Sequence, residues 1–184
     1  MAILKVAQLG NPVLRLKAEA IPQDVIRSAD AQSLIDDMIE TMREYNGVGL
    51  AAPQVHESVQ LIVVEADVNP RYKDAHSIPQ TVIINPKIAS FSDEMEEGWE
   101  GCLSLTDLWG KVRRAKNVRV TGLDRNAEPL TLDAEGFFAR ALQHEIDHLH
   151  GKVFIDRMKD LATLSFGKEY ARYGHLHEED GEAL

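Results

Sequence analysis

The sequence predicts a single α+β domain. Two segments with helical spacing of apolar residues lie near the two ends of the chain, and several segments rich in β-branched residues lie between them. These strands and helices do not alternate regularly, which indicates an α+β domain. The 184 residues, 44% of them hydrophobic, can enclose one continuous core, so one domain over 1–184 is expected.

The first predicted element is an amphipathic helix from Ala31 to Tyr45. Its apolar positions recur at helical spacing: Leu34, Ile35, Met38, Ile39 and Met42. Ser28 or Asp30 can cap its N-terminus, and Asn46-Gly47 is typical of a helix end.

Four strands are expected after this helix. They are placed around Val59 to Glu65, Thr81 to Ile84, Asn117 to Leu123 and Glu128 to Leu132. The last two should pair as a hairpin across Asp124-Arg125-Asn126. The acidic residues Asp93, Glu94, Glu96 and Glu97 are expected to form a solvated loop.

A second helix is predicted from Ala134 to His150, ended by Gly151. A polar C-terminal helix should follow from about Asp160 to Tyr173. The acidic tail, 175–184, has no pattern and is expected to fray.

The charge balance limits the partners. Thirty acidic residues against 20 basic ones give a formal charge of -10, which would repel a phosphate backbone, so no direct nucleic-acid partner is expected. The N-terminus does not have the pattern of a secretory signal, and no segment approaches the length of a membrane span. We therefore expect no membrane partner and a cytoplasmic location.

The second helix carries the most informative motif. His144 and His148 are four residues apart, so both rings lie on one face and can chelate one ion. Glu145 is then placed to handle a proton at the open coordination position. The alternative is a solvated polar face, although the apolar stripe along Leu142, Ile146 and Leu149 favours a helix packed in the core.

A catalytic ion usually has three protein ligands, so one more residue is needed. Cys102 is the only cysteine in the chain and follows Gly101, which permits close approach of the backbone to a bound group. We predict Cys102 as the third ligand; a small buried hydrophobic group is the alternative. Downstream donors such as Asp156 do not stand out. The segment Gly47 to Gln54, with two glycines and small residues, also permits close approach, or is a helix end followed by a buried turn.

Together these segments resemble the peptide deformylase family, whose signatures read G-x-G-(L/I)-A-A-x-Q, E-G-C-L-S and Q-H-E-x-D-H. They occur here in the same order, as Gly47 to Gln54, Glu100 to Ser104 and Gln143 to His148, and the similarity continues to Arg157. The resemblance implies antiparallel β-sheets packed around the central metal-binding helix. It also implies hydrolysis of the N-formyl group from the starting methionine of nascent chains.

The resemblance assigns roles to individual residues. Cys102, His144 and His148 would hold one divalent ion, with Fe²⁺ expected and Zn²⁺, Ni²⁺ or Co²⁺ able to occupy the same site. Glu145 would act as base and acid, while the Gln54 amide and the backbone N–H of Leu103 would stabilise the oxyanion. An ion pair between Glu100 and Arg114 would support the cysteine segment.

A pocket for the methionine side chain is also expected. Its predicted lining comprises Val48, Gly49, Leu50, Phe137 and Ala141, although Phe137 and Ala141 are equally compatible with a core role. After Ser104 the family's aliphatic-Pro-Gly run is absent, and Trp109 is placed at the channel mouth, against the second or third substrate residue. The other histidines are expected at the surface: His56, His76, His150, His175 and His177.

Three alternatives remain open from the sequence. A zinc endopeptidase would share the helix motif but would not need Cys102. A related enzyme could remove another N-acyl group, and a non-catalytic metal-binding protein would not need Glu145 or Gln54. Some relatives dock on the ribosome through a basic C-terminal helix, and the acidic tail here argues against that mode of docking.

Overall fold

The computed structural model describes residues 2–66 and 78–174. Its α-helices are α1 (Ala29–Glu44), α2 (Gly136–Leu149) and α3 (Gly167–Tyr173), and its short 3-10 helices are η1 (Pro12–Arg15), η2 (Ala52–Val55) and η3 (Phe154–Arg157). Its strands are β1 (Gly49–Ala51), β2 (Leu61–Ala66), β3 (Ile78–Phe91), β4 (Met95–Cys102), β5 (Leu105–Ala115), β6 (Asn117–Leu123), β7 (Pro129–Glu135) and β8 (Ser165–Phe166).

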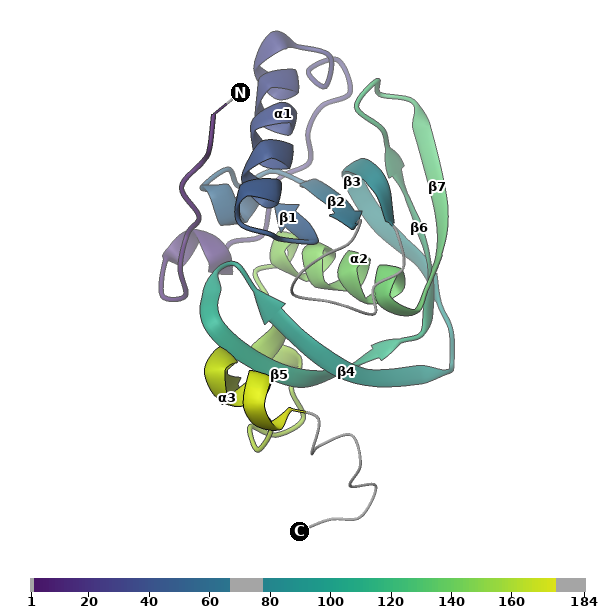
Figure 1. The fold of residues 1–184 in the computed structure, drawn as a ribbon. Coiled ribbons are helices and arrows are strands. Elements are labelled where there is room, and N and C mark those ends of the chain that lie inside the picture. The colour runs from purple at the N-terminus through teal and green to yellow at the C-terminus, as the bar shows by residue number, and fades with distance from the viewer. Residues whose placement is uncertain (1, 67–77, 175–184) are drawn as a thin grey trace.

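Two antiparallel sheets surround the central helix α2 (Figure 1). The larger has the strand order β1-β2-β3-β6-β7, and the smaller has the order β4-β5-β8. All pairs of strands within these sheets are antiparallel. The predicted α+β class, with antiparallel sheets around the metal-binding helix, is confirmed.

Strand β2 of the larger sheet is buried on both faces. Ile62 and Val64 pack in the hydrophobic cluster that contains the apolar side of α2, whereas Leu61 and Val63 pack in the cluster formed with α1. Successive side chains of a strand point to opposite faces, so a strand between two helices must be apolar throughout.

Helix α1 begins close to the predicted position. The side chain of Ser28 accepts a hydrogen bond from the backbone N–H of Ala31 at 3.2 Å, which identifies Ser28 as the N-cap. The helix ends at Glu44, and Asn46 then adopts a left-handed backbone with φ 53°. The Gly47 N–H donates to the Met42 carbonyl at 2.8 Å, so the Asn-Gly pair closes the helix as expected.

Helix α2 begins two residues later than predicted. Ala134 and Glu135 still belong to β7, where they pair with Val118 and Asn117 of β6. Gly136 then has φ 56°, a conformation that glycine adopts easily and that turns the chain from strand to helix. The helix ends at Leu149, beside Gly151 with φ 68°.

Two predictions about the other elements were wrong. Glu96 and Glu97 lie in strand β4 rather than in a loop, and they pair with Arg114 and Arg113 of β5. Helix α3 covers only the second half of the predicted C-terminal helix, because turns and strand β8 precede it. The strand predicted around Thr81 to Ile84 is present, as part of the longer strand β3.

His56 and His150 are exposed, as expected. His76, His175, His177 and the acidic tail lie outside the described residues. No helix in the described part of the chain is both long enough and apolar enough to cross a membrane.

Candidate metal centre and active site

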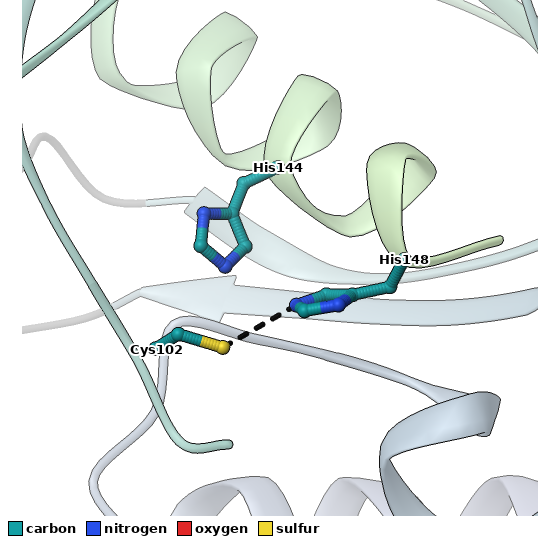
Figure 2. A group of neighbouring side chains, drawn as sticks. All are labelled: Cys102, His144 and His148. Carbon is teal, nitrogen blue, oxygen red and sulfur yellow. Dashed lines mark hydrogen bonds between the residues drawn. The ribbon is translucent and has the colours of Figure 1, made fainter. Parts of the chain in front are cut away.

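The structure brings together one thiol and two imidazoles. His144 and His148 project from the same face of α2, with ring centroids 5.0 Å apart, and Cys102 meets them from the end of β4 (Figure 2). One potential ligand atom of each residue lies within 4.8 Å of the other two, and all three residues are buried. Two nitrogens and a sulfur at this spacing fit a single divalent transition-metal ion.

Electrostatics prepare Cys102 to act as a ligand. Its Sγ lies 3.4 Å from Nε2 of His148. Burial opposes ionisation, but the two histidines hold the pKa of the Cys102 thiol well below its usual range. The thiolate is the form that binds metals, so the surroundings of Cys102 favour the protonation state that a metal ligand needs.

Glu100 orients one of the two imidazoles. Its Oε2 lies 2.9 Å from Nδ1 of His144, which leaves the other ring nitrogen to face Cys102. Burial alone would raise the pKa of Glu100, but Arg114 and His144 hold it far below its usual range. A carboxylate behind a ligating histidine fixes the tautomer and the orientation of the ring.

Arg114 holds this carboxylate in place. Its Nε and Nη2 donate to the two oxygens of Glu100 at 2.9 and 3.0 Å, so the predicted ion pair is present. Its Nη1 also donates to Asp147 at 2.5 Å, which ties strand β5 to helix α2. Arg140 donates to Glu100 at 3.0 Å and to the Val112 carbonyl at 2.7 Å. The cysteine strand is therefore joined to α2 through buried charges.

Glu145 lies beside the metal-ligand cluster and is 5% exposed. Burial raises the pKa of Glu145 to about 7, near the value that suits a group exchanging protons at neutral pH. Within the described residues its Oε2 has no hydrogen-bond partner, and neither does Nδ1 of His148. A buried carboxylate oxygen without a protein partner is expected where water or substrate is to bind.

Gln54 reaches the cluster from η2. Its Oε1 accepts the Ala51 N–H at 2.8 Å, which fixes the orientation of the amide. Nε2 is thereby directed to Cys102 Sγ at 3.4 Å and to Ser104 Oγ at 3.2 Å. Gln54 thus presents N–H groups, without a charge, next to the proposed ligands.

A pocket opens onto these residues. Of the predicted methionine-binding residues, Val48, Gly49, Phe137 and Ala141 line it, as do Leu103 and Gln54. The sequence reasoning missed Trp99 and Arg140, which also line it. Their positions depend on the pairing of β4 with β5, for which the sequence offered no turn signal.

Two predicted pocket residues lie elsewhere. Leu50 is fully buried in the cluster with α1, because its neighbours in β1 point to the α2 side and strand side chains alternate. Trp109 is 8% exposed and stacks on Tyr170 of α3, with centroids 4.6 Å apart and planes at 9°. The prediction that Leu50 lines the pocket was therefore wrong. Trp109 is not among the residues that line the pocket either, and its contact with substrate stays a prediction.

The fold and the site are those of a metal-dependent hydrolase: a buried Cys-His-His cluster, a buried carboxyl with a raised pKa beside it and a pocket that opens onto both. Comparison with known proteins identifies the family. The family model described as polypeptide deformylase matches residues 3–163. The chain belongs to the peptide deformylase family, and as such it is a hydrolase that removes the N-formyl group of nascent polypeptides.

Individual relatives agree over nearly the whole chain. Peptide deformylase 2 of Pseudomonas putida is 43% identical over 164 residues, covering 89% of this chain and 92% of that protein. Peptide deformylase 1 of Bordetella pertussis is 44% identical over 165 residues, covering 90% and 91%. Among solved structures, the Met-Ala-Ser-bound class I type b peptide deformylase of Acinetobacter baumannii has a TM-score of 0.83 and 43% identity, covering 85% of this chain and 99% of that one.

Proposed function

We propose that this enzyme hydrolyses N-formylmethionyl peptides with Glu145 as both general base and general acid. One observation carries the proposal: the buried carboxylate of Glu145 has an oxygen without a hydrogen-bond partner among the described residues and faces the pocket beside the Cys-His-His cluster. A proton acceptor at that place can activate water for attack on a carbonyl carbon.

Cys102, His144 and His148 would hold one divalent ion. When bound, such an ion acidifies water and polarises a carbonyl oxygen. Glu145 would take the proton of the attacking water and later deliver it to the amine of the leaving methionine, so formate and a free N-terminus are released. The Gln54 side-chain amide and the Leu103 backbone N–H would donate to the oxygen on which negative charge develops.

The pocket suits an unbranched apolar side chain. Val48, Phe137 and Ala141 contribute to its apolar lining, and the absence of a side chain at Gly49 leaves room beside Glu145. The A. baumannii relative was solved with Met-Ala-Ser bound, which has the sequence of a deformylated product. We therefore propose methionine as the preferred first residue.

Ferrous iron is the proposed native ion, on the family resemblance, while Zn²⁺, Ni²⁺ and Co²⁺ suit the same thiolate and imidazole ligands. Nascent chains are the proposed partners, so the proposed place of action is the cytoplasm, where they emerge from the ribosome. Ribosome docking through the acidic C-terminal tail is not part of the proposal.

Two competing functions are separable. An endopeptidase would take its third ligand after the helix, but Asp156 there is paired with Arg15, while Cys102 lies in the cluster. An enzyme for another N-acyl group would keep the cluster and differ in the substrates that it accepts.

The test is formate release from formyl-Met-Ala-Ser by protein loaded anaerobically with Fe²⁺. We expect turnover that is lost by at least about a hundredfold in Glu145→Gln with metal content retained, since base catalysis typically contributes 10² to 10⁴. Acetyl-Met-Ala-Ser is the matched control substrate. Equal release of acetate and formate, or full activity of Glu145→Gln, would contradict the proposal.

A further inference from the structure

The N-terminal segment Val6–Leu9 is hydrogen-bonded to the backbones of Gln54 and of Ser104, the residue that follows Leu103. The Ala7 N–H donates to the Gln54 carbonyl at 2.7 Å, and the Leu9 N–H donates to the Ser104 carbonyl at 2.8 Å. Gln54 Nε2 in turn donates to Ser104 Oγ at 3.2 Å. These three bonds and the short peptide from Ala7 to Leu9 close a ring, so Gln54 and Ser104 are tied together through a third segment.

The side chain of Gln8 extends this connection to Leu103. Its Nε2 donates to the Leu103 carbonyl at 3.1 Å and to the Val6 carbonyl at 3.4 Å. Its Oε1 accepts the hydroxyl of Thr106 at 2.6 Å. One amide thus spans the turn between β4 and β5 that begins immediately after Cys102.

Without these hydrogen bonds the turn between β4 and β5 could move, and the Leu103 N–H would move with it. Cys102 is fixed at one side of Leu103 by its place in the cluster, and Gln8 fixes the carbonyl at the other side. The peptide group that carries the Leu103 N–H lies between these two points. Donors act on a transition state only when they are held in place beforehand, since reorientation during the reaction would cost free energy.

The first half of the segment Val6–Leu9 is buried and the second half is exposed. Val6 and Ala7 are buried at 6% and 2% exposure and anchor the segment, whereas Gln8 and Leu9 are exposed. The polar contact with Leu103 is therefore made from the surface, by a side chain that contributes nothing to the hydrophobic core.

We infer that the segment Val6–Leu9 positions the oxyanion donors and that Gln8 is a positioning residue for the Leu103 N–H. The inference rests on the proposed function, in which Leu103 and Gln54 are the donors. Because these donors act on charge that develops in the transition state, loosening them lowers kcat and leaves KM largely unchanged. We expect Gln8→Ala to lower kcat roughly tenfold, a fraction of the 10² to 10³ lost with an entire donor.

The experiment compares Gln8→Ala, Gln8→Glu and Gln54→Ala with the parent enzyme, by kcat and KM for formyl-Met-Ala-Ser, metal content and thermal midpoint. Gln8→Glu keeps an acceptor for Thr106 but loses the donor to Leu103, so it should fall with Gln8→Ala. A second pair separates backbone bonding from side-chain effects. Leu9→Pro removes the N–H given to Ser104 and should lower kcat, while Leu9→Ala retains that N–H and should match the parent.

The outcomes are distinguishable. A large loss in Gln54→Ala with a smaller loss of kcat alone in Gln8→Ala and Gln8→Glu supports the inference. A large loss in Gln54→Ala with parental kcat in Gln8→Ala overturns it and leaves the proposed function standing. Parental kcat in Gln54→Ala contradicts the oxyanion role itself. A Gln8→Ala variant whose KM, metal content and thermal midpoint all change together would indicate a structural role and also overturn the inference.

Discussion

Gly49 shows how a single residue sets the position of the proposed base. A Cβ built at Gly49 would lie 2.6 Å from Cδ and 2.7 Å from Cγ of Glu145, closer than atoms in contact can come. The φ of Gly49 is not in the left-handed region, so the backbone itself accepts other residues. Space beside the carboxylate, rather than backbone conformation, therefore requires glycine here.

We expect Gly49→Ala to fold and to keep its metal but to displace the Glu145 carboxylate. Formate release should fall by at least about a hundredfold in kcat/KM, because a base out of reach no longer contributes. Gly167→Ala is a matched control, since its Cβ would meet its nearest atom at 3.5 Å, an ordinary contact. A Gly49→Ala enzyme with parental kcat/KM would mean that catalysis does not need Glu145 in its present place.

At this scale the sequence identified the reactive groups but only part of the network that supports them. Cys102 could be proposed because it is the only cysteine, and His144 and His148 because their spacing matches one turn of a helix. Arg140 had no such signal. It reaches Glu100 across the pairing of β4 with β5, a contact between residues 40 positions apart that no local pattern encodes.

At the scale of elements, prediction succeeded where the signal was local. Helix α1 has a cap, an apolar stripe and an end signal, and strand β6 has the predicted bounds. Strand β4 was missed because its first half is acidic and exposed; it is stabilised by pairing with the arginines of β5. Strand propensity depends more on neighbouring strands than on the residues themselves, so such an element is visible only in the assembled sheet.

The loop of the β6–β7 hairpin is closed by hydrogen bonds to Asp124, within the segment from which the sequence predicted the hairpin. Asp124 Oδ1 accepts the N–H groups of Asn126 at 2.7 Å and of Glu128 at 2.9 Å, which closes the loop. The N–H of Glu128, followed by that of Asn126, holds the pKa of Asp124 below its usual value. A carboxyl whose pKa is lower in the folded state stabilises the fold above its unfolded pKa, and this contribution is lost as pH falls through the folded pKa.

Asp124→Ala should therefore lower the thermal midpoint by on the order of 2 °C at pH 7, and the difference from the parent should shrink below about pH 4. Thermal unfolding followed by circular dichroism between pH 3 and pH 7 checks this. Asp93→Ala removes the same charge from the exposed loop between β3 and β4 and serves as the control. A difference that is independent of pH, or that grows as pH falls, would contradict the assignment.

At the scale of the whole molecule, one buried cation joins parts that are distant in sequence. Arg114 of β5 binds Glu100 of β4 and Asp147 of α2, and Asp147 also accepts from Arg157 of η3. The smaller sheet, the central helix and the segment after it thus meet at one charge network behind the metal ligands. The geometry of the site and the attachment of the smaller sheet to the rest of the fold have a common support.

Removing this cation takes one arginine partner from each of two buried carboxylates, although Arg140 still binds Glu100 and Arg157 still binds Asp147. Breaking a buried ion pair typically costs about 3 to 5 kcal/mol, and the remaining arginines place the cost here at the lower end of that range. Arg114→Ala should accordingly unfold on the order of 8 °C below the parent. It should also bind its metal about tenfold more weakly, because Glu100 is then held against His144 by Arg140 alone. Arg119→Ala is the matched control. It breaks an equally well-formed pair with Asp133, but both of those side chains are more than half exposed, and solvent screens them.

Thermal midpoints measured with saturating metal and with metal removed separate the effect of Arg114→Ala on the fold from its effect on metal binding. If the network supports the fold independently of the ion, Arg114→Ala is destabilised in both conditions; a deficit seen only with metal would confine its role to the metal centre, and a midpoint equal to that of Arg119→Ala would exclude both roles.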